Sequence, residues 1–534
     1  MKSIASALSI IALGFGLLGC PSGGGGGGEG TPAFAISTTA ADFGVVGNTY
    51  TSALSTTGGT APFIWTVFGG VLPNGLSLDA NTGVVSGTPG TADNSTVTFT
   101  VTDNTGRTAT GSVLFAIHTR TDRVSVNSSD TAGDGASSTP SINGDGSLVA
   151  FVSQSTNLVT TVSGIQIYVH NRQTNQIELI SRNNNASVVI AGNGVSSAPA
   201  MSADGRFVAF VSQSTNLVPG VSGQQVYLRD RQTGQTTLVS KSSNGITSNG
   251  LVNSSPAISG NGQFIAFVSN GTNVVTGVNG QQVYLHDRVT GATTLISKDN
   301  NPVPVPGNGD SATPSISSTG QVVAFASLAT NLGAAGGTQQ IYVHDRLSGV
   351  NGTTSLVSKE TVGGTAGNDA SSNPTISGDG RFVAFASVAT NLVVGVTGQQ
   401  IFLHDRNAGV NGTNSLISHD NNGVPVQGDA ASSLPSISSD GQVVSFTSLA
   451  TNMLNPAPAV AGQQIYSHDR SSGANGTTSL VSKDNSMAPV AGNFSSDQPS
   501  TNSDGGFVAF FSQATNLVIV PPAAPSDIYV RAMP

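Results

Sequence analysis

The chain has 534 residues, of which only 9% are charged, and its formal net charge is -9. Binding to nucleic-acid phosphates needs clustered Lys and Arg, so this mild acidity argues against a nucleic-acid partner. Frequent aliphatic runs and a modest net charge also exclude a largely disordered chain. Short apolar runs separated by Gly, Asn, Ser and Thr predict an all-β protein.

Residues 1–20, MKSIASALSIIALGFGLLGC, have the pattern of a signal peptide. The apolar run from Ile4 to Leu18 is short for a membrane span and suits a signal-peptide core. The sequence LLGC, Leu17 to Cys20, resembles the lipobox of bacterial lipoproteins. That resemblance implies cleavage before Cys20, acylation of its thiol and a membrane as partner. An ordinary secretory signal with a chance cysteine is the alternative, and no intrachain disulfide can form because Cys20 is the only cysteine.

Residues 21–31 are a Gly-rich tether that begins PSGGGGGGEG. A flexible chain of this length has a root-mean-square reach of roughly 20 Å. By the same lipoprotein resemblance, Pro21 in place of Asp favours retention in the outer membrane of a double-membraned cell. We therefore expect a lipid-anchored protein of the cell envelope, on either face of that membrane.

Residues 32–118 form a first module that contains Trp65, the only Trp. The string LPNGLSLDANTGVVSGTPG, Leu72 to Gly90, and the run from Phe99 to Ile117 resemble the putative-Ig module of bacterial surface proteins. This resemblance implies a cadherin-like β-sandwich. Trp65 is then expected in the core between the sheets.

Cadherin-like modules often bind calcium, which needs several converging oxygen ligands. The candidates here are Asp79 and Asp103, but these residues and Asp93 are scattered, and clustered acidic motifs are missing. Carboxylates that cap turns are the alternative explanation. We expect no other cofactor.

Residues 119–534 contain seven copies of one unit. Each copy has a Pro, then a Gly, then a Phe, and the Phe recurs at Phe151, Phe210, Phe267, Phe325, Phe385, Phe446 and Phe510. In the second copy we predict four strands, joined by tight turns at Asp204-Gly205 and Thr233-Gly234, at Ala200–Ser202, Phe207–Ser212, Gln225–Arg229 and Thr237–Lys241. Such turns make antiparallel neighbours, so seven four-stranded meanders predict a seven-bladed β-propeller.

The ends of the repeat region predict how the ring closes. The last copy stops at the third strand, DIYVRAMP, whereas residues 121–129, TDRVSVNSS, look like a fourth strand without a third. Val124-Ser125 matches Val239-Ser240 of the second copy. We therefore expect residues 121–129 to complete the seventh blade.

The repeat pattern SxDGxxVAFxS followed by IYVHDR resembles the TolB-like propeller repeats. Most propellers of that type have six blades, so a count of seven departs from the family. An Asp commonly precedes the third strand in such repeats. Here that place is Asp only at Asp527 and is Gln in most of the other copies, which weakens any metal role: Gln224, Gln281, Gln339, Gln399 and Gln463.

In a meander, the loops between the second and third strands and between blades share one face. In the second copy these are Ser214 to Gly223 and Ser242 to Ser255, which are long and variable, and long loops usually carry function. We call this the long-loop face. Three repeated features are interpreted as scaffold: an Asn in each loop between the second and third strands, a His on most third strands, and an Asp-Arg pair such as Asp287-Arg288 that brackets the next turn.

No G-x-S-x-G, H-E-x-x-H, P-loop or dinucleotide motif is present. The sequence therefore predicts a non-catalytic binding or scaffold lipoprotein, not an enzyme, whose long-loop face contacts a protein or glycan of the cell envelope. Two alternatives remain open: a carbohydrate-active enzyme that uses the same face, and a calcium-dependent adhesion protein.

Overall fold

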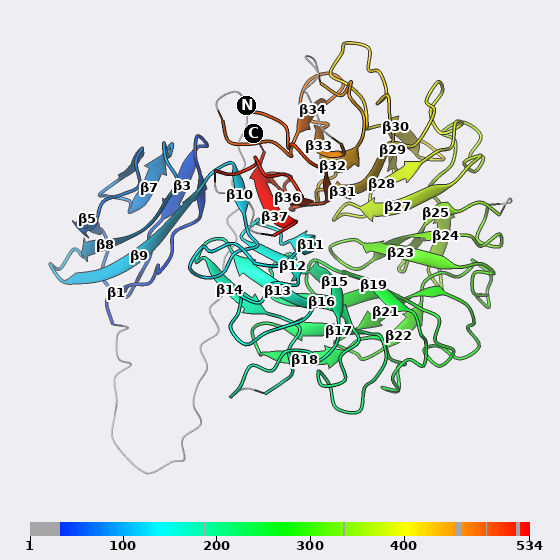
Figure 1. The fold of residues 1–534 in the computed structure, drawn as a ribbon, viewed down its shortest axis with the longest axis horizontal. Coiled ribbons are helices and arrows are strands. Elements are labelled where there is room, and N and C mark those ends of the chain that lie inside the picture. Colours follow the sequence, from blue (N-terminus) through cyan, green and yellow to red (C-terminus); the bar gives the residue numbers. More distant parts are fainter. Residues whose placement is uncertain are drawn as a thin grey trace.

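The computed structural model describes residues 33–185, 187–334, 337–454, 462–486, 489–519 and 524–533. A small β-sandwich lies beside a β-propeller (Figure 1). The predicted signal peptide, Cys20 and the tether lie outside the described residues. Within the described ranges, no helix is long and apolar enough to cross a membrane.

The sandwich is built from two sheets and a short strand pair. One sheet has the order β2 (Gly44–Val45), β9 (Thr108–His118), β8 (Asp93–Thr102) and β5 (Ile64–Gly69). The other has the order β3 (Tyr50–Ala53), β7 (Val84–Gly87) and β6 (Leu76–Leu78), and β1 (Ala35–Ile36) pairs with β4 (Thr56–Thr57). Trp65 is buried in the shared core with Phe99 and Phe115, as predicted.

In the described part of the chain, seven antiparallel four-stranded sheets form the propeller, as predicted. The strands, named A to D from the inside of each blade outward, are β11 (Ser137–Ile142), β12 (Leu148–Ser153), β13 (Gln166–Asn171) and β14 (Gln176–Leu179) in the first blade; β15 (Ser196–Met201), β16 (Phe207–Ser212), β17 (Gln225–Asp230) and β18 (Gln235–Leu238) in the second; β19 (Asn253–Ile258), β20 (Phe264–Ser269), β21 (Gln282–Asp287) and β22 (Thr293–Leu295) in the third; β23 (Ser311–Ile316), β24 (Val322–Ser327), β25 (Gln340–Asp345) and β26 (Thr353–Leu356) in the fourth; β27 (Ser371–Ile376), β28 (Phe382–Ser387), β29 (Gln400–Asp405) and β30 (Thr413–Leu416) in the fifth; β31 (Ser432–Ile437), β32 (Val443–Ser448), β33 (Gln464–Asp469) and β34 (Thr477–Leu480) in the sixth; and β35 (Ser496–Thr501), β36 (Phe507–Ser512) and β37 (Asp527–Ala532) in the seventh.

Strand A differs from the prediction, which started it after the Pro that recurs in each copy. In the second blade β15 begins at Ser196 and contains Pro199, at a bulge where the register shifts between Ser197 and Ala200. A Pro lacks the N–H that a sheet ladder needs, so it is tolerated at a bulge on an edge strand. The residue before the Pro has a positive φ in every blade: Thr139, Ala198, Ser255, Thr313, Asn373, Leu434 and Gln498.

Strand D also differs, because it ends at Leu238 instead of Lys241. The chain then turns away, although the Val239 amide still donates to the carbonyl of Val226. Strand B agrees with the prediction, and strand C is one residue longer.

The ring is closed by β10 (Thr121–Arg123), which pairs antiparallel with β37 and completes the seventh blade (Figure 1). The predicted closure is therefore confirmed, but the strand is shorter than residues 121–129. The Val124 amide still donates to the carbonyl of Ile528, and Val126 then bridges Ala132 in a turn.

The blades pack through repeated aromatic side chains. Phe210 and Tyr227 face each other on neighbouring strands, with ring centroids 5.8 Å apart, and both are fully buried. At the opposite end of the ring from the long loops, backbone N–H groups donate from blade to blade in a closed circle, at 2.8 to 3.1 Å, through Gly144, Ala203, Gly260, Ser318, Gly378, Ser439 and Ser503. This circle fixes the blades relative to one another.

Candidate functional site

The loops that join blades do not all stay on the long-loop face, which corrects the sequence prediction. After β22 the chain forms a hairpin in which Lys298 bridges Pro306. The Asn300 side chain pairs with both backbone groups of Thr354 on strand D of the next blade, at 2.6 and 2.7 Å. Asn351, in the turn after strand C of that blade, donates to the carbonyl of Pro302 at 3.0 Å. The hairpin therefore clamps the outer edge of the next blade.

The same clamp secures the closing strand. The amide of Asn485 accepts from the Thr121 N–H and donates to the Thr121 carbonyl, both at 2.7 Å. The two ends of the propeller, far apart in sequence, are thus held by a bond pair that repeats elsewhere between ordinary blades.

The repeated Asn of the B–C loop has a scaffold role, as predicted. The Asn216 side-chain carbonyl accepts from the Asn193 N–H at 3.0 Å, and its amide donates to the carbonyl of Ala191 at 2.8 Å. The equivalent pair of bonds recurs in each blade, at Asn157, Asn273, Asn331, Asn391, Asn452 and Asn516. Each Asn therefore uses both its side-chain carbonyl and its side-chain NH2 group to join two loops.

The repeated His residues are buried inside the blades. The Nδ1 atom of His286 lies 2.9 Å from the hydroxyl of Thr293 on strand D, and burial lowers the pKa of His286 to about 4. His344, His404 and His468 are arranged similarly. In the described residues no group of three or more His, Cys, Asp and Glu side chains is placed to hold a metal.

The Asp-Arg pairs bracket the turn after strand C, as predicted. The carboxylate of Asp287 accepts from the Val289 N–H at 2.9 Å. Arg288 donates to the carbonyl of Gly262 and covers the ring of Phe207 in the preceding blade at 4.1 Å. Gly262 has φ of +69°, and a Cβ there would meet the same Phe207 ring, so only Gly fits this contact.

The Gln residues that the sequence pattern places at the position of Asp527 lie one residue before the true equivalents. Asp527 pairs with Ser512, and the residues paired with the equivalent Ser are Gln166, Gln225, Gln282, Gln340, Gln400 and Gln464. Asp527 is buried, accepts from the Ser125 hydroxyl at 2.7 Å and faces Arg123, whose Nε lies 3.4 Å from its Oδ2. It therefore belongs to the ring closure.

The two calcium candidates both act within turns. Asp79 accepts from the N–H groups of Asn81 and Thr82. Asp103 accepts from Thr105 and from Arg107, whose Nη2 lies 2.7 Å away. Burial would raise the pKa of Asp103, but these hydrogen bonds outweigh it and hold the pKa well below its usual range. Both carboxylates are thus used in the sandwich itself.

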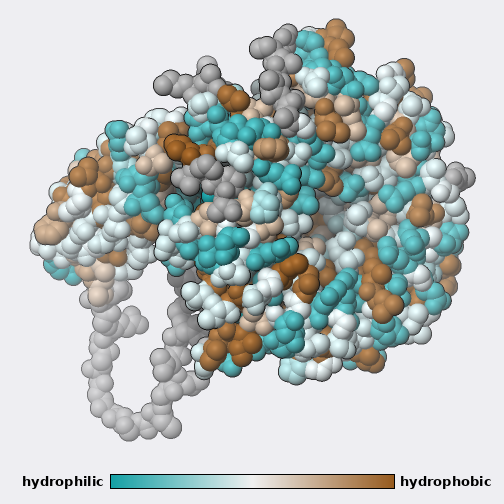
Figure 2. Space-filling model, in the orientation of Figure 1, coloured by the Kyte–Doolittle hydropathy of each residue, from teal (hydrophilic) through white to brown (hydrophobic). Residues whose placement is uncertain are grey.

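Apolar side chains surround the long-loop end of the innermost strands. We call these residues, which sit just before strand A or just after strand B, the mouth ring: Val195, Leu251, Leu328, Leu449 and Phe494, exposed by 43% to 86%. The A strands contact one another around the propeller axis, so these residues, from five of the seven blades, lie near the channel at the long-loop ends of their strands. Figure 2 shows the hollow at the centre of the propeller, with hydrophobic residues interspersed among hydrophilic ones around it.

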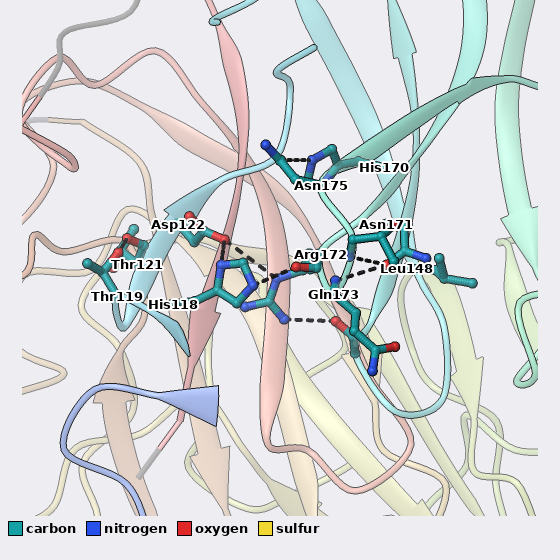
Figure 3. A network of polar contacts seen from close by, with 12 residues as sticks. His118, Thr119, Thr121, Asp122, Leu148, His170, Asn171, Arg172, Gln173 and Asn175 are labelled. Atoms are coloured by element: carbon teal, nitrogen blue, oxygen red, sulfur yellow. Dashed lines mark hydrogen bonds and ion pairs between the residues drawn. The ribbon is translucent and has the colours of Figure 1, made fainter. Parts of the chain in front are cut away.

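A polar network joins the sandwich to the propeller, and no sequence pattern pointed to it (Figure 3). His118, at the end of β9, contacts the Asp122 carboxylate through Nδ1 at 2.8 Å and the Arg172 carbonyl through Nε2 at 2.7 Å. Both partners are acceptors, so His118 satisfies both only when each ring nitrogen carries a hydrogen. Burial would raise the pKa of Asp122, but His118 and Arg172 outweigh it and lower the pKa.

Next to this network lies a cleft between the sandwich and the closing blade. Two adjoining cavities, of about 350 and 510 Å³, share the residues Thr119, Asp122, Arg123 and Asp130. The first extends toward Asp93 and His170, and the second toward Asp484 and the chain from Asn516 to Ile519. We call the two together the junction cleft. The only sequence signal for the cleft is a departure from the repeat on strand D. His170 is paired with Ile177, whereas the equivalent His286 is paired with Thr293.

Comparisons with known proteins agree with this architecture. Residues 31–119 match the family described as "Putative Ig domain". No curated protein matches the sequence. Among solved structures, the chain is similar to TolB from Acinetobacter baumannii, with 14% identity, a TM-score of 0.35, and coverage of 78% of this chain and 81% of that one.

It is also similar to the β-propeller domain of the Trilobed protease from Pyrococcus furiosus, with 11% identity, a TM-score of 0.41, and coverage of 74% of this chain and 92% of that one. These values support no conclusion about function. By its strand pairing and its family match, the chain is an all-β protein with an Ig-like sandwich followed by a seven-bladed propeller.

Proposed function

We propose that this chain is a lipid-anchored protein of the cell envelope that binds a partner protein, without catalysis, through the mouth ring on the long-loop face of its propeller. The supporting observation is a contrast at this face. The repeated Asn side chains of the loops form hydrogen bonds to neighbouring loops. The variable positions around the channel mouth expose apolar side chains instead. Grouped exposed apolar residues of this kind are typical of protein-binding surfaces.

A protein partner suits this surface better than a glycan does. Sugar rings are commonly held against exposed aromatic faces, because one face of the sugar is apolar. Trp65 and all seven Tyr residues are buried in the structure. The mouth ring is aliphatic except for Phe494, so it offers little aromatic surface for a sugar.

An enzymatic role on the same face has less support. A glycosidase needs two carboxyl groups that face the substrate. The carboxylates of Asp134 and Asp429, at this end of the blades, each hold the N–H and the hydroxyl of a Thr in the neighbouring loop, Thr156 and Thr451 respectively. Calcium-dependent adhesion is also less favoured, because Asp79 and Asp103 are engaged in their own turns.

The anchor rests on the sequence of residues 1–20. We expect Cys20 to be acylated and the protein to fractionate with the outer membrane. Metabolic labelling with a palmitate analogue tests this directly: the wild-type chain should carry the label, and Cys20→Ser should lose it and be released into the soluble fraction. Label retained by the Ser variant would contradict lipidation at Cys20.

The binding function is tested with residues 32–534 in a screen against purified envelope proteins. The variant Leu251→Ser/Leu449→Ser/Phe494→Ser removes apolar surface from the mouth ring without touching a buried residue. A matched control, Val350→Ser/Val410→Ser, removes fully exposed Val side chains from turns after strand C. We expect the first variant to weaken binding at least tenfold and the control to bind normally. Equal binding by all three proteins would contradict the assignment of the face.

A further inference from the structure

The exposed apolar side chains of the sandwich are gathered at one edge. Among its described residues, every large apolar side chain that is exposed lies on β5 or in the turn that follows it. These residues, which we call the β5 patch, are exposed by 40% to 81%: Ile64, Val67, Phe68 and Val71. The chain around them is also uncharged, because no Asp, Glu, Lys, Arg or His lies between Asp42 and Asp79. A grouped, charge-free apolar surface of this kind marks a site of interaction.

The β5 patch lies on the side of the sandwich that is remote from the propeller (Figure 1). β5 is the last strand of its sheet, next to β8, whereas β2 forms the opposite edge. Phe43, which precedes β2, contacts Phe507 of the propeller with ring centroids 5.2 Å apart. Figure 2 shows hydrophobic residues at the same remote end of the sandwich. A surface that covers the β5 patch therefore lies away from the propeller and its mouth ring.

The predicted tether joins the sandwich beside the start of β5. Phe34 stacks on Phe63, the residue before β5, with ring centroids 6.0 Å apart. Only residues 21–32 separate Cys20 from Ala33, where the described structure begins. A chain of this length spans roughly 40 Å when fully extended and roughly 20 Å on average when flexible. A lipid on Cys20 therefore keeps the β5 patch close to the membrane surface.

We propose that the β5 patch is a membrane contact, whose side chains insert between the lipid headgroups of the bilayer that holds Cys20. This inference rests on the proposed lipid anchor, which supplies the surface. No charged side chain of the patch has to be desolvated when it enters the lipid. A short flexible tether also gives an effective concentration in the millimolar range, so even a weak contact is populated.

A second copy of the chain fits this edge less well than a lipid surface does. An exposed edge strand pairs with another chain through a regular row of free backbone N–H and C=O groups. β5 is irregular, because its register with β8 shifts between Val67 and Gly69. The Trp65 N–H also donates to the carbonyl of Ala80 at 2.8 Å. A bulge of this kind turns an edge away from a second strand, whereas lipid contact requires only the exposed side chains.

Fluorescence quenching on vesicles tests this contact. The chain from residue 21 to 534, with a His tag in place of Cys20, is bound to phosphatidylcholine vesicles through a nickel-chelating lipid, so the test supplies its own anchor. The tagged chain has no cysteine, and Thr66→Cys then carries a single fluorophore at an exposed position of β5. We expect spin-labelled phosphatidylcholine to quench this fluorophore, and to leave one at Val350→Cys, on the propeller, unquenched. Val350 is 100% exposed, so its label reports the surrounding solvent.

The variant Phe68→Ser/Val71→Ser, made in the Thr66→Cys chain, removes the two most exposed members of the β5 patch. It should reduce the quenching to the level of the Val350 label, because each lost apolar side chain weakens partition into lipid about tenfold. Val350→Ser/Val410→Ser is the matched control, and it should be quenched as the wild type is. Unchanged thermal melting of the Trp65 signal confirms that the sandwich of each variant is folded.

The proposal is overturned if the Thr66 label is not quenched, or if the Phe68→Ser/Val71→Ser variant is quenched as strongly as the wild type. It is also overturned if sedimentation of the chain without vesicles shows a dimer that this variant dissociates, because the patch then binds a second copy. Palmitate labelling of Cys20 in cells does not enter this test. The lipid anchor and the membrane contact can therefore fail separately.

Discussion

The closing blade contains a buried pair of charges that predicts a measurable energetic coupling. The position of Arg123 is Leu in the six other blades, and the position of Asp527 is Gln: Leu179, Leu238, Leu295, Leu356, Leu416 and Leu480 for the first, and Gln166, Gln225, Gln282, Gln340, Gln400 and Gln464 for the second. Both departures from the repeat occur in the same blade. The perturbation is to restore the repeat with Arg123→Leu, Asp527→Gln and the double variant.

Each single substitution should cost more than the pair. Arg123→Leu leaves the carboxylate of Asp527, which is fully buried, with only the Ser125 hydroxyl, and Asp527→Gln leaves Arg123, 8% exposed, facing a neutral group. Removing one partner of a buried pair costs about 3–5 kcal/mol, and replacing both is often nearly neutral. Because the Nε–Oδ2 distance is 3.4 Å, we take the lower end. We expect about 3 kcal/mol for each single variant, about 1 kcal/mol for the double variant, and so a coupling of about 5 kcal/mol.

Urea unfolding with two spectroscopic probes measures this coupling. Six Tyr residues lie on strand C of the propeller, so near-ultraviolet circular dichroism of Tyr reports the propeller. Trp65 fluorescence reports the sandwich separately. Single variants that lose stability in the Tyr signal and regain it in the double variant would support the reasoning. Additive losses, with a coupling below about 0.5 kcal/mol, would refute it.

Three further predictions concern the core, the junction and the sandwich. Phe210→Ala removes a fully buried ring and should destabilise the propeller by about 3–5 kcal/mol in the same urea assay, and a loss below about 1 kcal/mol would contradict its place in the core. Because the folded pKa of Asp122 is lowered, its contribution to stability is present above the ordinary Asp pKa and is lost as the pH falls through the folded value. His118→Ala should reduce this acid-dependent loss in a pH series of unfolding, whereas an unchanged pH dependence would show that the pair does not act. Calcium should shift the melting temperature by less than about 1 °C, and Asp103→Ala should lower the melting midpoint of the Trp65 signal; a clear calcium stabilisation that the Ala variant loses would reverse this assignment.

Features that recur in every blade could be predicted from the sequence. The Phe and Gly positions of every blade, and the Asp-Arg pair of five blades, each satisfy a local requirement, such as a turn with positive φ at Gly262 or a buried ring at Phe210. The ring closure was predictable as well, because a missing strand at one end matched an extra strand at the other. Local rules repeated seven times leave a strong pattern in the sequence.

Features that depend on contacts between distant segments could not be predicted in this way. The hairpin that carries Asn300 reaches the next blade through a pairing with Thr354, and no local pattern marks that partner. The bulge at Pro199 is not predicted either, because the sequence pattern places strand A after this Pro. The junction cleft depends on how the sandwich contacts the propeller, and single-residue departures such as Ile177 gain meaning only when the neighbouring side chains are known.

Site-specific photo-crosslinking in intact cells tests the central claim most directly. A photo-reactive residue is placed at Leu251 in the mouth ring, which is 86% exposed, or at Val350 on a turn after strand C, which is 100% exposed. Our account predicts a discrete protein adduct from Leu251 and none from Val350. An adduct from Val350 alone, or identical adducts from both positions, would contradict binding through the mouth of the propeller.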